Sequence, residues 1–218
     1  PLLTGWYQGL LSGREITSEL YGETKTFYPT KGSPQGGVLS PLVWNMAISS
    51  LAEKFRTGPV KAVMYADDVL LLCQGVDPAT IASKMQEALH KTSEWADQQG
   101  LVFNPAKTQC CHFDPRRRHP PWPTLTMNRT ELEYVRSFEY LGLIIDDKLN
   151  WQEHIKNKCL KAKRLLNSVK QTVGNEWGLS PEKIMWIFKA IVRPQISYGA
   201  VVWAHRVTKG VRKKLDSV

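Results

Sequence analysis

Two adjacent carboxylates lie between two short apolar runs, and their type and spacing are suited to chemistry. The runs, Val60 to Tyr65 and Val69 to Cys73, predict two strands of a buried hairpin. Asp67 and Asp68 then fall at the hairpin tip, within a four-residue turn. Neighbouring carboxylates repel each other unless a cation or water compensates their charge. The pair therefore indicates a divalent-cation site or an ordinary polar turn, since Asp is also a common turn residue.

The segment before this hairpin is rich in glycine and proline. Between Lys31 and Pro41 there are three glycines and two prolines in eleven residues, which requires special backbone geometry and close approach of another group. Ser40 followed by Pro41 predicts a helix start with Ser40 as the N-cap. Apolar residues continue at helical spacing to about Phe55.

The remaining elements position these residues, and they follow from apolar periodicity and turn residues. We expect a hairpin around Tyr21-Gly22, a helix from Asp77-Pro78 to Gly100, a strand from Gln109 to Phe113, an exposed loop from Asp114 to Pro123, a hairpin at Asn128-Arg129, a strand pair from Val135 to Ile145 bent at Gly142, a structural turn at Asp146-Asp147, and a capping box at Asn150 and Glu153.

The whole chain has a net charge of +9, and its positive charge is concentrated in the C-terminal third. Residues 1–150 contain 15 basic and 16 acidic residues, whereas residues 151–218 contain 14 basic and 4 acidic ones. From Trp151 the apolar residues follow helical spacing with lysines opposite, and Ser180-Pro181 starts a further helix that Pro194 should end. A basic helical segment beside a near-neutral body indicates a polyanion partner, above all nucleic acid, or a solvated helix face.

Composition excludes several classes of protein. The 218 residues are 42% hydrophobic and 22% charged, which is ordinary for a globular protein of one large or two small domains. No run of about 18 uncharged apolar residues occurs, so we expect no membrane span. The four cysteines lack metal-ligand spacing and are expected to be reduced. The chain starts at Pro1 without a signal pattern, so we expect a cut through a larger protein.

Three segments, in this order and spacing, resemble the reverse transcriptase family. They are Gly32 to Pro41 (GSPQGGVLSP), Tyr65-Ala66-Asp67-Asp68, and Gly100 to Thr108 (GLVFNPAKT). The later Phe138 to Gly142 (FEYLG) is similar to the primer-grip strand pair of that family. The extended pattern is most similar to non-LTR (LINE-type) retrotransposons, and the resemblance covers roughly residues 5 to 204.

The resemblance implies an α+β fold in the form of a partial right-hand polymerase. Residues 1–147 would be part of the palm, an antiparallel sheet with helices, residues 151–204 a small all-helical basic thumb, and residues 205–218 a basic tail or linker. The site of the family needs another aspartate before the glycine-rich loop, but no Asp precedes Asp67. We therefore expect the first catalytic strand and the fingers to be missing, and the 218-residue fragment to be inactive alone.

The resemblance also implies roles for individual residues. Asp67 would be a metal ligand, assisted by Asp68, for two Mg²⁺ ions, with Mn²⁺ as the alternative ion. Lys107 matches a lysine near the triphosphate, where it can neutralise or protonate the leaving pyrophosphate. The contacts with nucleotide and template fall on Pro34, Gln35, Gly36, Tyr65 and Ala66, the primer grip on Tyr140, Leu141 and Gly142, and the contacts with the nucleic-acid backbone on Lys156, Lys161, Lys163 and Arg164.

The implied activity is RNA-directed DNA synthesis by a retrotransposon polyprotein. Its partners would be an RNA template, a DNA primer and deoxynucleoside triphosphates, with no membrane; the location would be intracellular, and nuclear in a eukaryotic host. Two alternatives stay open: a non-catalytic remnant that binds nucleic acid, and a group II intron-type reverse transcriptase or maturase. The stretch from Tyr140 to Trp151 and the segment Tyr198 to Trp203 favour the retrotransposon. The oligomeric state is left open.

Overall fold

The computed structural model describes residues 5, 8–9, 11–30, 32–114, 122–172, 174, 177–207 and 209–216. These residues form helices and small two-stranded sheets, so the predicted α+β class is confirmed. The chain divides into two compact units, Pro1–Phe103 with Trp122–Met127, and Asn104–Pro121 with Asn128–Val218. These units differ from the division into palm and thumb near residue 148, which stays a prediction.

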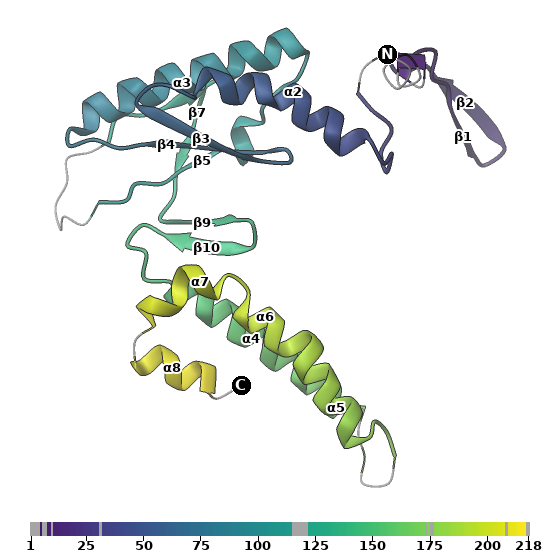
Figure 1. The fold of residues 1–218 in the computed structure, drawn as a ribbon, viewed down its shortest axis with the longest axis vertical. Helices are drawn as coiled ribbons and strands as arrows, with labels where there is room; N and C mark the ends of the chain where they lie inside the picture. The colour runs from purple at the N-terminus through teal and green to yellow at the C-terminus, as the bar shows by residue number, and fades with distance from the viewer. Residues whose placement is uncertain are drawn as a thin grey trace. The chain divides into compact units, whose positions relative to one another are not determined.

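The core of the first unit lies between one hairpin and two helices that cover one of its faces (Figure 1). The hairpin consists of β3 (Val60–Tyr65) and β4 (Asp68–Cys73), and the helices are α2 (Ser40–Lys54) and α3 (Pro78–Gln99). Each fully buried large apolar side chain in such a core contributes about 1.5–3 kcal/mol to stability. The buried members are Ile48, Leu51, Phe55, Val60, Ala88, Trp95 and Ala96.

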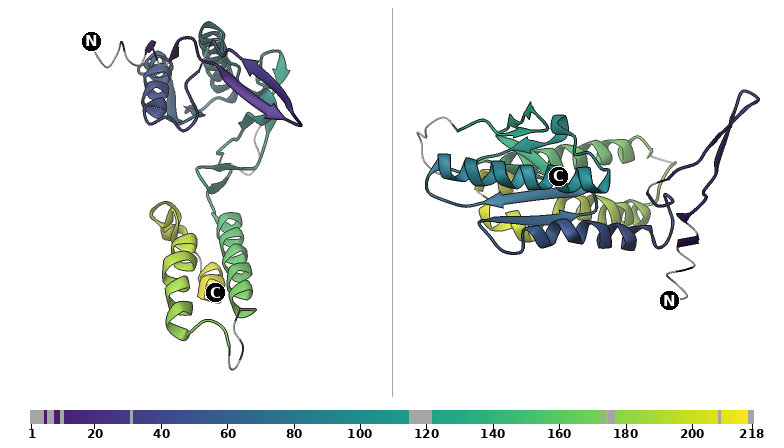
Figure 2. Two further views of the ribbon diagram at one scale, coloured as in Figure 1. Left: turned by 90° about the vertical axis from the view of Figure 1, so that its right-hand side faces the viewer. Right: turned by 90° about the horizontal axis from the view of Figure 1, so that it is seen from above.

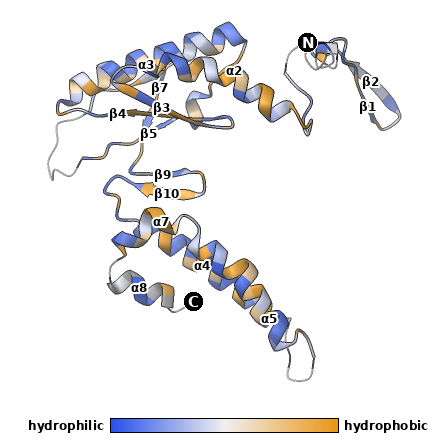
Figure 3. Ribbon diagram, viewed as in Figure 1, coloured by the Kyte–Doolittle hydropathy of each residue, from blue (hydrophilic) through white to orange (hydrophobic). Residues whose placement is uncertain are grey.

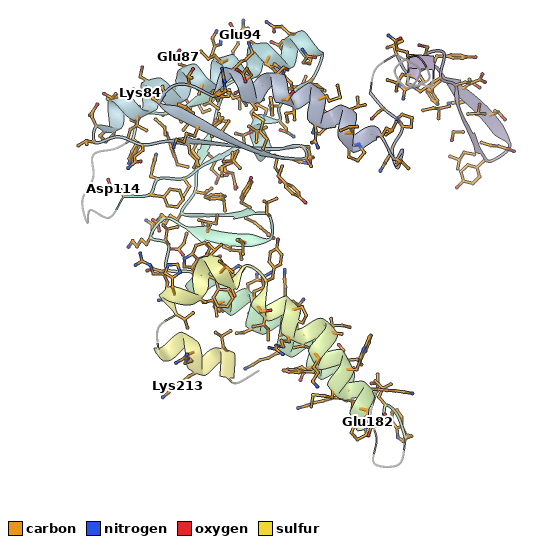
Figure 4. All side chains as sticks on the ribbon, viewed as in Figure 1. Lys84, Glu87, Glu94, Asp114, Glu182 and Lys213 are labelled. Carbon is orange, nitrogen blue, oxygen red and sulfur yellow. The ribbon has the colours of Figure 1, made fainter. Side chains whose placement is uncertain are left out.

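Helix α3 has the two ends that the sequence predicts. The carboxylate Oδ2 of Asp77 accepts hydrogen bonds from the hydroxyl of Thr80 at 2.6 Å and from its backbone N–H at 2.7 Å, and these bonds lower the pKa of Asp77. Gly100 ends the helix in the left-handed conformation, with a φ of 66°. The outer side carries an ion pair between Lys91 and Glu87, and Glu87 lies on the side of α3 away from the hairpin (Figure 4).

An exposed hairpin begins the described part of the first unit. Strands β1 (Ile16–Leu20) and β2 (Glu23–Phe27) pair antiparallel around Tyr21-Gly22, as predicted, and both turn residues have positive φ. Both strands are exposed along their whole length. Just before them, Nη2 of Arg14 donates to the carbonyl oxygen of Gly32 at 2.9 Å, which joins this segment to the glycine-rich loop.

The second unit contains two pairs of strands. In one pair, β5 (Gln109–Cys110) and β8 (Glu133–Tyr134) run parallel. In the other, β9 (Ser137–Tyr140) and β10 (Leu143–Asp146) run antiparallel around the predicted bend, which is confirmed at Leu141-Gly142. The short strands β6 (Thr126–Met127), which belongs to the first unit, and β7 (Thr130–Glu131) flank Asn128-Arg129, where both residues have positive φ. Residues 115–121 of the predicted exposed loop lie outside the described residues.

Asp146 organises the turn that leads from β10 into the following helix. Its Oδ1 accepts from the backbone N–H of Lys148 at 3.1 Å and of Asn150 at 3.0 Å, and its Oδ2 accepts from that of Trp151 at 2.7 Å. The structural role predicted for this aspartate is therefore confirmed. The predicted capping box is wrong, because α4 (Gln152–Lys170) has Trp151 as its N-cap without a side-chain cap, and Asp146 binds the preceding amides instead.

A long helical segment runs beside α4 (Figure 2). It consists of α5 (Pro181–Ile187), the π-helical segment η2 (Phe188–Val192) and α6 (Arg193–Ser197). The prediction that Pro194 ends this helix is wrong, because Pro194 lies in the first turn of α6. Proline cannot donate to the carbonyl four residues back, and the wider π turn just before it accommodates this missing bond.

The apolar cluster of the second unit joins β10 to the helices. Trp151, Ile155 and Cys159 of the α4 region pack against Trp203 of α7 (Ala200–Trp203), with half-buried residues of β10 around them. Figure 3 shows apolar residues along both β10 and α7. The stretch predicted to be a basic tail or linker contains helix α8 (Lys209–Asp216), in which Leu215 packs against this cluster. Among the described helices, none is both long and apolar enough to cross a membrane.

Candidate functional site

The acidic pair lies at the tip of a hairpin that is buried on one face only. Alternate residues of β3 and β4 face the core, whereas Tyr65 on the other face is 62% exposed. The predicted burial of the hairpin therefore holds for one face only. The register pairs Tyr65 with Asp68, so Tyr65 to Asp68 form the predicted four-residue turn, with Ala66 and Asp67 at its centre. Asp68 is the first residue of β4, and its side chain shares the open face with Tyr65.

Helix α2 holds this turn in place through a tryptophan. The indole Nε1 of Trp44 donates to the carbonyl oxygen of Ala66 at 2.6 Å. Ala66 has a φ of 52°, a left-handed conformation that costs a non-glycine residue roughly 1–2 kcal/mol. The hydrogen bond from α2 offsets part of this cost, so Trp44 fixes the conformation of the residue that precedes Asp67.

The same helix also holds the glycine-rich loop. The hydroxyl of Ser40 donates to the carbonyl oxygen of Pro34 at 2.7 Å, and the backbone N–H of Gly37 donates to the same oxygen at 3.1 Å. The prediction that Ser40 caps α2 is wrong: Leu39 is the N-cap, and the Ser40 hydroxyl closes the loop instead. Gly36 has a φ of 80°, which glycine adopts without strain. Gln35, between these fixed points, is exposed.

The electrostatics of the tip suit a cation. Asp67 and Asp68 are both exposed, and within the described part of the chain neither side chain has a hydrogen bond or an ion pair. Adjacent carboxylate oxygens without compensation are the donors that hard divalent ions such as Mg²⁺ prefer. The described residues contain no group of three or more His, Cys, Asp or Glu side chains that could hold a metal ion. The pair thus fits part of a metal site.

Lys107 belongs to the second unit and is presented by a short, capped turn. It ends the 3-10 helix η1 (Pro105–Lys107), and its side chain is exposed. Asn104 builds this turn: its Oδ1 accepts from the backbone N–H of Ala106 at 3.0 Å, and its carbonyl oxygen accepts from the hydroxyl of Thr108 at 2.9 Å. The residues around Lys107 therefore fix its backbone and leave its ammonium group in solvent.

The three residues predicted as a primer grip lie together at one hairpin turn in the second unit. Tyr140 ends β9 and is half-buried, and Leu141 and Gly142 form the turn with φ values of 48° and 75°. The hydroxyl of Tyr198 donates to the carbonyl oxygen of Leu141 at 2.8 Å. This turn is therefore held by a residue 57 positions away in the sequence.

The four residues predicted to contact the nucleic-acid backbone are exposed on α4. No acidic residue occurs in α4 after its first turn. The buried side of the same helix contains His154, which the sequence did not single out. Burial keeps the pKa of His154 below its ordinary value, and the positive charge of nearby Lys158 lowers this pKa further. Its Nδ1 accepts from the backbone N–H of Ile144 at 3.1 Å, which ties α4 to β10. The four exposed basic residues of α4 are Lys156, Lys161, Lys163 and Arg164.

The predicted site residues thus fall into two groups, one in each unit. In the first unit, α2 connects the Pro34-Gln35-Gly36 loop with the tip from Tyr65 to Asp68 through Ser40 and Trp44. The second unit contains Lys107, the hairpin turn and the basic face of α4. Sequence reasoning missed Trp44, His154 and Tyr198. The signal for Trp44 was its place one helical turn after Ser40, on the same face.

A glycine-rich loop held by the first turn of α2 and followed by a Tyr-Ala-Asp-Asp hairpin is typical of nucleic-acid polymerases of the reverse transcriptase class. Residues 2–145 match the family described as reverse transcriptase (RNA-dependent DNA polymerase), so the chain belongs to this family. The recognised family is thereby confirmed.

The relatives that match are proteins of non-LTR retrotransposons. The chain is 26% identical over 199 residues to a putative 115 kDa protein of the retrotransposable element R1DM of Drosophila melanogaster. The matched region covers 91% of the chain and 19% of that protein. The chain is also 26% identical over 181 residues to the RNA-directed DNA polymerase from mobile element jockey of Drosophila funebris, covering 79% and 19%. A Pol polyprotein of element R1 of Nasonia vitripennis is 23% identical, covering 86% and 57%.

The chain spans between about a fifth and just over half of the length of these relatives. The names of the relatives agree with the predicted retrotransposon rather than with the intron-type alternative. No solved structure matches the chain.

Proposed function

We propose that this chain is the part of a reverse transcriptase that carries the Asp67 half of a two-metal site, in a retrotransposon protein that copies RNA into DNA. The observation that carries the proposal is the uncompensated Asp67-Asp68 pair on a tip fixed by Trp44. In the proposed reaction the primer 3′-hydroxyl attacks the α-phosphorus of a deoxynucleoside triphosphate and pyrophosphate leaves. RNA template, DNA primer and nucleoside triphosphate are therefore the proposed partners.

Asp67 and Asp68 are the residues of this chain that would hold Mg²⁺. When bound, Mg²⁺ supplies activation of the attacking hydroxyl and neutralisation of the charge on the leaving pyrophosphate. The contribution of the protein is a fixed position for the two carboxylates, which the hairpin register and the Trp44 hydrogen bond provide. Asp67, within the turn, is the proposed principal ligand, and Asp68, at the start of β4, assists it.

Substrate contacts are proposed for the residues around this tip. Gln35 is exposed and lies between Gly36 and Pro34, whose carbonyl oxygen accepts from the Ser40 hydroxyl. It is therefore suited to lie against the incoming nucleotide and the template. Tyr65 and the backbone of Ala66 would contact the primer end from the open face of the hairpin. Lys107 would neutralise the leaving pyrophosphate with its exposed ammonium group.

Nucleic-acid positioning is proposed for the second unit. The turn Tyr140-Leu141-Gly142 would hold the primer as the primer grip, and the four exposed basic residues of α4 would bind backbone phosphates. Such contacts are independent of base sequence, because they neutralise phosphate charge. A non-catalytic nucleic-acid-binding remnant is the second candidate, favoured by the absence of a third metal-binding carboxylate among the described residues.

The test is primer extension on an RNA template by the full-length protein that contains this chain. Asp67→Asn keeps the shape of the side chain and removes its charge, and we expect extension to fall by about 10²- to 10³-fold, the scale for loss of a main transition-state stabiliser. Asp97→Asn makes the same change at an exposed position of α3 and should leave extension unchanged. Equal activity of the Asp67 variant and the parent would refute the site, and no extension by the parent would favour the remnant.

A further inference from the structure

The β9–β10 hairpin is attached to the helices of the second unit at its turn and along β10. At the turn, the hydroxyl of Tyr198 donates to the carbonyl oxygen of Leu141 at 2.8 Å. Along β10, Nδ1 of His154 accepts from the N–H of Ile144 at 3.1 Å. These two bonds come from different helical segments and bind consecutive parts of the same hairpin, so the hairpin is fixed both in position and in orientation.

The β9–β10 hairpin and the segment Tyr198-Gly199 also approach each other closely, which reinforces this attachment. A Cβ added to Gly142 would lie 3.3 Å from Cε1 of Tyr198, and a Cβ added to Gly199 would lie 2.5 Å from Cδ2 of Leu143. Gly199 also has a φ of 67°, which disfavours any other residue there. Gly142 in the hairpin turn and Gly199 before α7 therefore allow the hairpin and the start of α7 to touch.

The side chain of Tyr198 is itself held from two directions. Nζ of Lys158 lies 5.0 Å from the centre of the Tyr198 ring, within the range of a cation–π interaction. The indole Nε1 of the buried Trp203 donates to the backbone carbonyl oxygen of Tyr198 at 3.0 Å. A hydroxyl mounted on so constrained a residue can set the position of the Leu141 carbonyl rather than follow it.

We propose that Tyr198 is a positioning residue for the primer 3′ end, because it locks the Leu141-Gly142 turn onto the helices so that hairpin and helices move as one body. This inference rests on the proposed function, in which that turn contacts the primer. Leu141 has a φ of 48°, a conformation that a non-glycine residue leaves readily when nothing holds it. Without the Tyr198 hydroxyl the turn relaxes, and the primer end loses its alignment with the attacked phosphorus.

The test uses Tyr198→Phe in the full-length protein, since this change removes only the hydroxyl and keeps the ring against Lys158. Hydrogen–deuterium exchange of peptides from residues 137–146 should become about fivefold faster, the factor expected when one hydrogen bond is removed. In primer extension, kcat per folded enzyme should fall at least about tenfold, while Kd for primer–template changes less than twofold. Tyr21→Phe removes the hydroxyl of a fully exposed turn residue and should change neither measurement.

The outcomes separate this inference from the proposed function. Unchanged exchange in Tyr198→Phe would overturn the lock, and faster exchange with unchanged kcat would overturn the positioning role, in both cases without touching the site at Asp67. A fall in affinity for primer–template with unchanged kcat would also overturn it, because it would make Tyr198 a binding residue. Full extension by Asp67→Asn would refute the proposed function, whereas the exchange measurement would still decide the lock.

Discussion

Replacement of Trp44 by phenylalanine should impair catalysis more than it impairs stability. The change removes the indole N–H that donates to the carbonyl oxygen of Ala66 at 2.6 Å. Loss of a hydrogen bond of this kind costs about 0.5–1.5 kcal/mol of folding free energy. The left-handed conformation of Ala66 opposes the native turn by roughly 1–2 kcal/mol. The two free energies are of similar size, so the variant should populate other turn conformations.

The functional loss follows from the position of Asp67 directly after Ala66. A shift of a catalytic group by about 1 Å can cost about 100-fold in rate. A turn that is only partly native should therefore reduce kcat of primer extension by about 5- to 100-fold in the full-length protein, measured in single turnovers and normalised to folded enzyme. The free energy of unfolding, measured in urea, should fall by only about 0.5–1.5 kcal/mol.

Trp95→Phe is the matched control, because it deletes the same kind of donor elsewhere in the same unit. The indole Nε1 of Trp95 donates to the hydroxyl of Ser50 at 2.8 Å, and its ring is buried in the core. This variant should lose at least as much stability as Trp44→Phe and leave kcat unchanged. Equal losses of kcat in the two variants, or none in Trp44→Phe, would refute the view that α2 positions the catalytic turn.

Two further predictions concern the second unit. Because burial keeps the pKa of folded His154 below its ordinary 6.5, the unfolded chain takes up this proton first as the pH falls. The free energy of unfolding should therefore decrease below about pH 6.5, and His154→Asn should flatten this dependence whereas His205→Asn, at an exposed position, should not. Binding of duplex should depend less steeply on salt when the four basic residues of α4 become alanine, by up to about 0.9 in the slope of log K against log[salt] for each phosphate that the helix no longer neutralises. An equal change after removal of four exposed charges in the first unit, at Lys25, Lys54, Arg56 and Lys91, would contradict the specific role of α4.

The local rules of sequence were sufficient for most elements. The α3 helix begins and ends where Asp77-Pro78 and Gly100 predict, because both signals act within a few residues. The rules failed where a distant group competes for the same atom. Ser40 has the features of an N-cap, whose oxygen accepts from a backbone N–H, but its hydroxyl donates to the carbonyl oxygen of Pro34, six residues back. Pro194 is tolerated inside a helix because the π turn before it removes the need for the missing bond.

The candidate site shows the same division between local and distant information. The adjacent carboxylates, the turn and the glycine-rich loop are visible as motifs, because each is made of neighbouring residues. The groups that fix them are Trp44 for the Ala66 carbonyl and Tyr198 for the Leu141 carbonyl, and these pairs are 22 and 57 residues apart. Nothing in the sequence around either carbonyl indicates its donor. Only the packing of α2 on the hairpin, and of the helices on β9–β10, brings each donor into place.

The two donors act in the same way on the turn proposed to be catalytic and on the turn proposed to contact the primer. In each case an aromatic side chain, Trp44 within α2 or Tyr198 directly after α6, donates to the carbonyl oxygen of a left-handed, non-glycine residue at a two-residue hairpin turn. A left-handed residue without such a bond favours other conformations, so the turn by itself is a weak mount. A helix-borne donor turns it into a rigid one, because the helix is held by the core behind it. Substitutions at the two aromatic residues should therefore act on rate through geometry, although neither side chain carries a group that takes part in the reaction.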